Sequence, residues 1–593
     1  MNILGYSGLD NSVSFKRREL PGLQDVEYRI GQGFDSAAAV VSGGRVRAAA
    51  AEERYTEEKA TGRFPLQAMA DCLRRAGLSP RDLDYVAHGF SYQPGVLEDV
   101  DEFSARRFEE VYDPAVQLRL LTDAYPQEDW TARFVAVPHH LAHAASAYYP
   151  SGFADALVLV ADGMGETESL TVAVGSQGKL DVLHRIPALH SLGTLYSVFT
   201  HYLGFLIAMD EYKVMGLAPY GNRRRYHDEL MSMVRLGENG TFSIPLLARN
   251  RNLVERETQR GVLRALIERL GPLRPPGAPI EQRHMDIAAG LQATLETCLL
   301  HVLRHFQAET GLRDLCFAGG VALNCTANGV IARSRLFDRV FVPPGAGDDG
   351  TAIGAALYVQ ADREPGTEIS RMSMPYWGPA FTEAEIGHAV EATDGVSARR
   401  VDDFDEIVTE VAGHLEAGRV VAWFQGGMEF GPRALGNRSI LADPRDARMR
   451  DHINGLIKQR EDFRPFAPIV TEEDAAEYFE IRPGTERQYA HMLFTTRTRA
   501  IHRVRLGAVT HVDGSARVQV VTRDGNPRMW ALLNAFKART GMPVLLNTSF
   551  NLRGQPIVRT PEIAVETFLR GGLDHLVIGN HVLAPVSETG PVS

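Results

Sequence analysis

Cysteine is scarce in this chain. Its 593 residues include four cysteines, Cys72, Cys298, Cys316 and Cys325, and none forms a C-x-x-C pair. A disulfide framework or a structural zinc site needs cysteines in close, repeated spacing, so the sequence argues against both. We interpret the four as packing residues.

Long apolar runs are also missing. No stretch comes near the roughly 18 uninterrupted apolar residues of a membrane span, and the opening MNILGYSG lacks a basic n-region and a cleavage site. These features predict a cytoplasmic protein with no membrane partner. The net charge is −11 and no extended basic stripe occurs, which argues against a nucleic-acid partner.

A strand pattern near the N-terminus occurs twice. NILGYSG, DSAAAVVSGG and RVRAAAAEER read as three strands, with Gly43 and Gly44 in a hairpin turn. ALVLVADGMGE, SLTVAVGSQG and KLDVLHRI repeat the pattern later in the chain. The repeat predicts two similar lobes, as in the actin, Hsp70 and sugar-kinase superfamily (the ASKHA fold), where ATP lies between the lobes.

The chain is longer than a single domain, for which about 150 residues is typical, so we expect two or more domains. ADREPGTEISRMSMPYWGP is rich in Pro, Gly and Ser and lacks periodicity, which marks a boundary near residues 361–380. We predict an N-terminal α/β domain at residues 1–362 and a second α/β domain at residues 375–593. The second opens with a helix, FDEIVTEVAGHLEAG, and a buried strand, RVVAWFQ.

Three histidines stand in the short stretch VPHHLAHAASAYYP. His139 and His143 lie four residues apart, so on a helix they share one face, whereas His140 is turned about 100° away. Two imidazoles one turn apart can bind a single metal ion. The alternatives are a surface coincidence or a hydrogen-bonded pair in the core.

Two aspartates are candidates for the remaining ligands. Asp162 ends the apolar strand ALVLVAD, where Gly163 in the turn DGMGE lets a phosphate approach the backbone. Asp348 lies in the Gly-rich loop of PPGAGDDGTAIGAA, just before a helix. The alternatives are a hairpin turn for Asp162 and helix capping by Asp348 or Asp349. Two imidazoles with two carboxylates suit iron, manganese or zinc better than calcium or magnesium.

A second set of residues suggests nucleotide contacts. In CFAGGVALNCTANG a strand leads into Gly319 and Gly320, which lack side chains, and Asn324 follows at the start of a helix. MDEYKVMGLAPYG places Lys213 in an expected loop. There it can meet a phosphate or be an ordinary solvated turn residue.

The second domain carries the densest polar segment, GPRALGNRSILADPR followed by INGLIKQREDFRPFAP. Guanidinium groups bind phosphate oxygens bidentately, so these cations predict a pocket for a phosphorylated small substrate. Its predicted members are Arg433, Arg438, Lys458 and Arg464, with Arg517 in HVDGSARVQV and Ser549 in LLNTSFNLRGQPIV further along. The alternative is a set of surface ion pairs with Asp443, Asp446, Glu461 and Asp462.

These motifs together resemble the NodU/CmcH-type O-carbamoyltransferases, a family that includes the tobramycin carbamoyltransferase of antibiotic biosynthesis. The resemblance extends over nearly the whole chain, through motifs such as HHLAHA, VADGMGE, YKVMGLAPYG, GGVALNC, GDDGTAIGAA, EFGPRALGNRSILADPR, DFRPFAP and NTSFNLRGQPIV. It implies an N-terminal ASKHA-type domain that binds ATP and iron, and a C-terminal YrdC-like α/β domain.

The resemblance also implies a reaction. The C-terminal domain of the family forms carbamoyladenylate from carbamoyl phosphate and ATP, releasing phosphate and pyrophosphate. The N-terminal domain then transfers the carbamoyl group to a hydroxyl of a small natural product. Fe²⁺ is the implied metal, Mn²⁺ and Zn²⁺ are alternatives, and Mg²⁺ is an option with ATP.

The family's site residues can be placed on this sequence. Its metal ligands fall on His139, His143, Asp162 and Asp348. Its carbamoyl phosphate contacts fall on Arg433, Lys458 and Arg464, with Arg517 and Ser549 around the adenylate.

One position departs from the family. Where many members carry His before an early aspartate, this chain has Phe34 in GFDSAAA, which leaves Asp35 as the nearby polar candidate. We also expect His140 to position or deprotonate the acceptor hydroxyl. A homodimer is one option for assembly. The rival readings are a sugar-kinase-like phosphotransferase and a non-catalytic nucleotide-binding protein.

Overall fold

The computed structural model describes residues 1–93, 101–458 and 460–586. Within these ranges, no helix has the length and apolar character needed to cross a membrane. The chain divides into two compact units. The first comprises residues 1–56 and 60–372, and the second residues 57–59 and 373–593. The assignment of separate chemistry to each unit stays a prediction.

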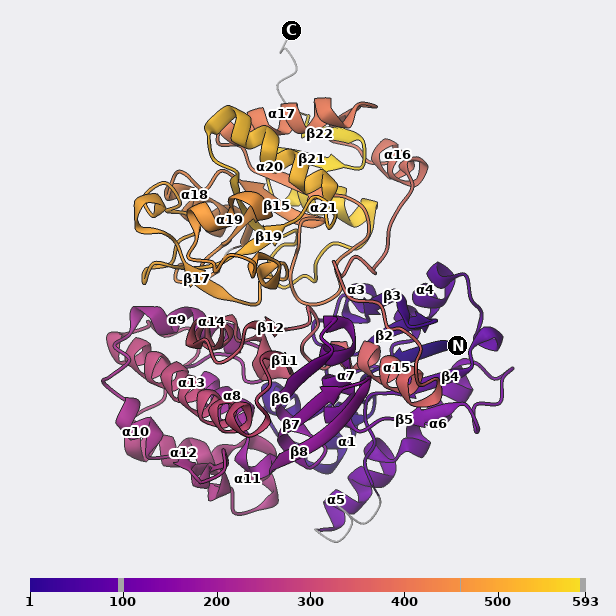
Figure 1. Ribbon diagram of the computed structural model, residues 1–593, viewed down its shortest axis with the longest axis vertical. Helices are drawn as coiled ribbons and strands as arrows, with labels where there is room; N and C mark the ends of the chain where they lie inside the picture. The colour runs from indigo at the N-terminus through magenta and orange to yellow at the C-terminus, as the bar shows by residue number, and fades with distance from the viewer. Residues whose placement is uncertain (94–100, 459, 587–593) are drawn as a thin grey trace. The chain divides into compact units, whose positions relative to one another are not determined.

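The first unit contains two five-stranded sheets of the same topology (Figure 1). In each sheet three strands form an antiparallel meander, and two later strands extend it in parallel beside the first. One sheet has the order β3-β2-β1-β4-β5, formed by β1 (Asn2–Tyr6), β2 (Ala37–Ser42), β3 (Arg45–Ala51), β4 (Tyr85–His88) and β5 (Phe134–Ala136). The other has the order β12-β11-β6-β7-β8, formed by β6 (Asp155–Gly165), β7 (Glu168–Ser176), β8 (Lys179–Pro187), β11 (Asp314–Ala318) and β12 (Arg339–Phe341).

The repeated meander and its hairpin turn were both predicted, and both are confirmed. Gly43 and Gly44 have φ of 55° and 74°, the left-handed values that a two-residue hairpin turn requires. The predicted helix after the first meander is α4 (Leu66–Ala76), which ends at Gly77 with φ of 69°. The two-lobed architecture expected from the sequence is therefore present.

Two helices connect the sheets to the candidate site. α7 (His139–Ser151) packs on β6 and β11, α15 (Asp349–Arg363) packs on β1, β2 and β4, and the two helices contact each other. Their approach is close because α15 is rich in Gly and Ala. A Cβ on Gly354 would lie 1.8 Å from the carbonyl oxygen of Ala142 in α7.

The other α-helices and strands of this unit lie around the two sheets (Figure 1). They are α1 (Ser12–Glu19), α2 (Asp25–Tyr28), α3 (Glu53–Thr56), α5 (Glu102–Arg107), α6 (Pro114–Ala124), α8 (Leu192–Tyr202), α9 (Glu211–Leu217), α10 (His227–Met231), β9 (Arg235–Leu236), β10 (Phe242–Ser243), α11 (Leu253–Thr258), α12 (Arg260–Leu270), α13 (Gln282–Thr310) and α14 (Cys325–Ser334).

The second unit is built on an eight-stranded mixed sheet of order β13-β22-β21-β14-β15-β20-β16-β19. Its strands are β13 (Val396–Arg400), β14 (Val421–Phe424), β15 (Arg438–Ala442), β16 (Ala467–Thr471), β19 (Gln519–Val521), β20 (Val544–Ser549), β21 (His575–Ile578) and β22 (His581–Pro585), with β17 (Thr495–Arg497) and β18 (Ser515–Arg517) in a separate pair. Its helices are α16 (Glu383–Glu391), α17 (Phe404–Glu416), α18 (Arg448–Ile453), α19 (Glu472–Tyr478), α20 (Pro527–Thr540) and α21 (Pro561–Arg570).

The core of this unit lies between the sheet and the pair α17 and α20. Val411 and Leu415 of α17 and Phe536 of α20 pack with Trp423 of β14, all fully buried. The predicted helix and buried strand are thus α17 and β14, but they do not open the unit, because α16 and β13 precede them. The unit fits the expected YrdC-like α/β domain, and the fold class predicted from the sequence is confirmed.

The contact between α7 and α15 gives a testable consequence. Gly354→Ala forces a methyl group into the α7 backbone, so we expect it to lower the free energy of unfolding of the first unit by about 1–3 kcal/mol. Calorimetric unfolding of the full chain measures this as a lower midpoint. Gly413 in α17 is the matched control, because its added Cβ would meet Arg539 no closer than 3.6 Å. Gly413→Ala should leave the midpoint unchanged or raise it, and equal midpoints for both variants would contradict the close approach.

Candidate functional site

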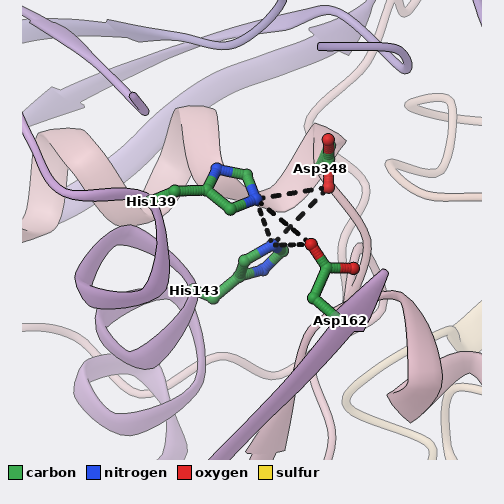
Figure 2. A group of neighbouring side chains, drawn as sticks. All are labelled: His139, His143, Asp162 and Asp348. Carbon is green, nitrogen blue, oxygen red and sulfur yellow. Dashed lines mark hydrogen bonds and ion pairs between the residues drawn. The ribbon is translucent and has the colours of Figure 1, made fainter. Parts of the chain in front are cut away.

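The predicted helical face of histidines is present in the structure. His139 and His143 lie on α7, both with 0% exposure, and their Nε2 atoms face each other at 3.1 Å (Figure 2). The surface alternative is therefore wrong for this pair.

Asp162 of β6 and Asp348, just before α15, complete a group of four with the two histidines (Figure 2). His139 Nε2 lies 3.4 Å from Asp162 Oδ2 and 3.5 Å from Asp348 Oδ1. The corresponding distances from His143 Nε2 are 3.9 and 3.6 Å. The Asp348 side chain makes no capping hydrogen bond to α15. One donor atom from each residue lies within 4.8 Å of the others.

Electrostatics couple the four side chains. Burial acts to lower the pKa of His139, but the carboxylates of Asp348 and Asp162 outweigh it and raise that pKa well above 6.5. Burial acts in the opposite sense on the carboxyls, and the imidazoles outweigh it, so the pKa values of Asp162 and Asp348 are lowered. The carboxylates are thus held as anions, the form that binds a cation.

Contacts outside the group orient two of its members. The Nδ1 atom of His139 lies 2.9 Å from the carbonyl oxygen of Gly89, and the Phe90 ring stacks on the imidazole with centroids 4.0 Å apart. The Gly320 N–H donates to Asp162 Oδ1 at 3.0 Å. A backbone acceptor on Nδ1 leaves Nε2 available to a metal. The donor set therefore fits a first-row transition-metal ion, and the identity of the ion stays a prediction.

His140 lies outside the group of four. Its Nδ1 atom is 2.7 Å from the Thr171 hydroxyl, and its Nε2 atom is enclosed beneath Gly165, where an added Cβ would lie 2.6 Å away. Burial and the neighbouring His139 lower the pKa of His140 to about 3, so the ring is neutral. This arrangement favours a role in positioning over direct proton transfer.

Asp35 stands at an exposed, strained position. Its φ is 54°, a left-handed value that few residues other than glycine adopt. Although the residue is exposed, loss of hydration beside the carboxyls of Asp349, Glu53 and Asp348 raises its pKa. Asp35 therefore interacts electrostatically with Asp348, a member of the group, and a catalytic role for it stays a prediction.

The predicted nucleotide residues have structural partners. Gly319 has φ of 92°, and an added Cβ would lie 2.2 Å from the Ala161 carbonyl oxygen, so close packing of β11 on β6 requires glycine there. The carbonyl of Gly163 accepts a hydrogen bond from Thr194. The Asn324 side chain caps α14 by accepting from Ala327 N at 2.9 Å. Nucleotide contact by these residues stays a prediction.

The loop expected around Lys213 is wrong, because the residue lies within α9. Lys213 Nζ is 3.0 Å from Asp210 Oδ2, three residues earlier, and this pair stabilises the first turn of the helix. A helix of seven residues is too short to show a clear helical period.

In the second unit, Lys458 lies beside Ser549 and Asn551. Lys458 is 6% exposed, and its Nζ donates to the carbonyl oxygens of Ser549 at 2.5 Å and Asn551 at 2.9 Å and to Asn551 Oδ1 at 2.8 Å. Burial, and the positive charges of Arg460 and Arg464, lower its pKa well below 10.5. All three ammonium protons have partners, so Lys458 holds the segment after β20 in this conformation.

The arginines of this unit differ in their surroundings. Arg433, Arg464 and Arg517 are partly exposed, and Arg464 pairs with Glu461 at 3.6 Å. Arg438 is 0% exposed, and its guanidinium donates to backbone carbonyl oxygens, including that of Gln425 at 2.6 Å. The prediction that Arg438 binds phosphate is therefore wrong, because its donors support the fold. Asp443 and Asp446 pair instead with Arg445 and Arg448.

Sequence reasoning missed the residues that surround His139. Gly89, Phe90 and Glu166 contact it from segments far apart in the chain, and two of these contacts use backbone atoms. Only Glu166 had a visible signal, as the acidic residue of the turn DGMGE.

The raised pKa of His139 predicts how metal affinity changes with pH. Below that pKa the ring is protonated, and an ion must displace the proton, so affinity should rise by up to about tenfold per pH unit between roughly pH 6 and 8. Titration calorimetry of metal-stripped protein with Zn²⁺ measures this slope. His305→Ala, on α13 away from the group, should leave it unchanged. An affinity independent of pH would exclude His139 as a ligand.

Comparisons with known proteins cover both units. The family model described as "Carbamoyltransferase N-terminus" matches residues 30–357, and "Carbamoyltransferase C-terminus" matches residues 412–584. Among solved structures, the Acidaminococcus fermentans (R)-2-hydroxyglutaryl-CoA dehydratase component A matches at 13% identity with a TM-score of 0.32, covering 60% of this chain and 97% of that one. That likeness is too weak to carry an argument.

Curated relatives match at higher identity. "Nodulation protein NolNO" of Sinorhizobium fredii is 40% identical over 561 residues, 93% of this chain and 78% of that protein. An uncharacterized protein of Synechocystis sp. is 39% identical, covering 93% of this chain and 95% of its own length. The 3'-hydroxymethylcephem-O-carbamoyltransferase of Amycolatopsis lactamdurans is 38% identical over 305 residues, 51% of this chain and 55% of that enzyme. With family models matched in both units and a relative aligned over most of both lengths, the chain belongs to the carbamoyltransferase family.

Proposed function

We propose that the protein is an ATP-dependent O-carbamoyltransferase that uses carbamoyl phosphate. In the second unit, water cleaves carbamoyl phosphate, which releases phosphate and leaves a carbamate. The resulting carbamate oxygen bonds to the α-phosphorus of ATP as pyrophosphate leaves. The first unit then transfers the carbamoyl group to an alcohol, releasing AMP.

The group of four, with three buried members and Asp348 partly exposed, is the observation that carries the proposal. In a member of the carbamoyltransferase family, a transition-metal site in the two-lobed first unit suits the transfer half of the reaction. His139, His143, Asp162 and Asp348 would hold the ion. When bound, the ion supplies Lewis acidity that polarises a phosphate or carbonyl oxygen.

Other residues of the first unit would serve this step without touching the ion. His140, fixed by Thr171, holds α7 against β7 and so positions the ligand face beside it. Asp35 has a raised pKa and an exposed carboxyl, properties that suit a group that accepts the proton of an attacking hydroxyl. Gly163, where an added Cβ would meet nothing within 4 Å, leaves room for a phosphate oxygen beside the backbone.

In the second unit, Arg433, Arg464 and Arg517 would bind the phosphates of both substrates, with Mg²⁺ accompanying ATP. Lys458 keeps Ser549 and Asn551 in place through its three hydrogen bonds. It contacts carbamoyl phosphate directly only if it exchanges one of these partners. Enclosing the mixed anhydride within the protein protects it from water.

The acceptor is a hydroxyl of a small natural product. The Amycolatopsis relative, named for a hydroxymethylcephem, supports an alcohol acceptor of this kind. Mass spectrometry with carbamoyl phosphate, ATP and a panel of hydroxylated antibiotic precursors tests it. The expected product carries one added carbamoyl group, and ADP formation without pyrophosphate would instead indicate a kinase.

Replacing a predicted metal ligand should separate the two half-reactions. We expect His139→Ala to lower carbamoyl transfer by more than about a hundredfold, because an imidazole donor is lost. Pyrophosphate release from ATP and carbamoyl phosphate should continue. Loss of pyrophosphate release in this variant would contradict the division of labour.

The opposite pattern is expected for the second unit. Lys458→Ala releases the Ser549–Asn551 segment, so adenylate formation should fall by more than about a hundredfold. The variant should still use carbamoyladenylate supplied directly, which also shows that the first unit is folded. Normal activity with carbamoyl phosphate would contradict a role for Lys458.

A further inference from the structure

The segment Gly89–Ser91, directly after β4, contacts the His139 ring through its first two residues, and we call this segment the cradle. The Gly89 carbonyl oxygen is 2.9 Å from His139 Nδ1, and the Phe90 ring stacks on the imidazole at an interplanar angle of 15°. The backbone N–H of Ser91, the third residue, donates to a carboxylate. The orientation of His139 thus depends on where this segment is held.

One carboxylate oxygen holds both the cradle and the helix that carries His139. Glu166 Oε1 accepts from Ser91 N at 2.5 Å and from His139 N at 3.1 Å. His139 is the first residue of α7, where backbone N–H groups lack helical partners, and the preceding Pro138 makes no side-chain cap. Glu166 therefore caps α7 from another element, and a carboxylate is the group that a helix N-terminus favours.

The turn that carries Glu166 is itself fixed. Glu166 lies between β6 and β7 with φ of 60°, a left-handed conformation that is unfavourable for a residue other than glycine. Its own N–H donates to Gln32 Oε1 at 3.2 Å, and the Tyr92 hydroxyl donates to the same oxygen. Gln32 and Tyr92 are 5% and 2% exposed, so this support is buried.

We propose that Glu166 is a positioning residue for the candidate metal centre: its carboxylate sets the backbone of His139 and the segment that orients the His139 ring. The inference rests on the proposed function only in requiring that the group of four binds a metal ion. Glu166 itself touches neither the ion nor the substrate. Through Glu166, the turn that follows Asp162 is connected to the backbone of His139, and both Asp162 and His139 are proposed ligands.

Asp155 provides a control in the same pair of strands. It is the first residue of β6, at the end of the strand away from Asp162, and its carboxylate accepts from the Ser176 hydroxyl of β7 at 2.5 Å. Glu166→Ala and Asp155→Ala thus each remove one hydrogen-bonded carboxylate from the same two-strand unit, and they differ in the connection to His139.

Metal affinity of the full-length, metal-stripped protein tests the proposal, with Zn²⁺ and Mn²⁺ as probe ions in titration calorimetry. We expect Glu166→Ala to weaken binding by about 10–100-fold, and Asp155→Ala to leave it within about threefold of the unaltered protein. Glu166→Gln keeps an acceptor oxygen and should restore most of the affinity. If the alanine variant does not fold, Glu166→Asp, one methylene shorter, takes its place and should weaken binding in the same direction.

Two controls separate a positioning role from general destabilisation. The unfolding midpoint of the metal-free variants reports stability by itself, and a merely structural role would lower it while leaving metal affinity unchanged. That outcome, or equal affinity in Glu166→Ala and Asp155→Ala, would overturn the inference. Failure of the unaltered protein to bind either ion would instead contradict the metal centre on which the proposed function depends.

Discussion

The structure depends most on the packing of two carboxylates against two imidazoles. Asp162 is buried and Asp348 is partly exposed; the two would repel each other, and His139 and His143 supply the opposing partners. Removing one member leaves the charges of the others without balance, which is costly in a protein interior. A divalent cation would satisfy all four donors at once, which gives a physical reason for their convergence.

The fold explains how residues so far apart in sequence reach one point. β6 carries Asp162 three residues before its last residue, α7 carries both histidines, and Asp348 directly precedes α15. α7 and α15 can approach closely because Gly354 has no side chain that would clash with the Ala142 carbonyl oxygen. The same geometry shows why Gly319 is required where β11 passes β6. Small residues in these elements thus determine the position of polar ones.

Much of this was accessible from the sequence. Period-two strands, glycine turns and the four-residue spacing of His139 and His143 predicted the meanders and the ligand face, because these signals are local. Side-chain partners were less accessible, since they depend on tertiary contacts. Arg438 shows the limit: its sequence context matched a phosphate site, but it is fully buried with backbone carbonyls as partners. Lys213 shows another, because a seven-residue helix is too short for a clear period.

The support around His139 was beyond sequence reasoning for the same reason. The Gly89 carbonyl and the Ser91 N–H are backbone atoms, which any residue type offers. The second unit behaves similarly, since Lys458 is held by carbonyl oxygens as well as by the Asn551 side chain. Chemistry-bearing side chains can be read from motifs, whereas the groups that orient them require coordinates.

X-ray absorption at the metal edge tests the central claim most directly. The protein loaded with its ion should show two imidazole nitrogens and at least two oxygens at about 2.0–2.2 Å, with the outer-shell scattering typical of histidine rings. His143→Ala should reduce the imidazole count from two to one. A spectrum with oxygen neighbours alone would contradict the account, because the ion would then lie elsewhere in the molecule.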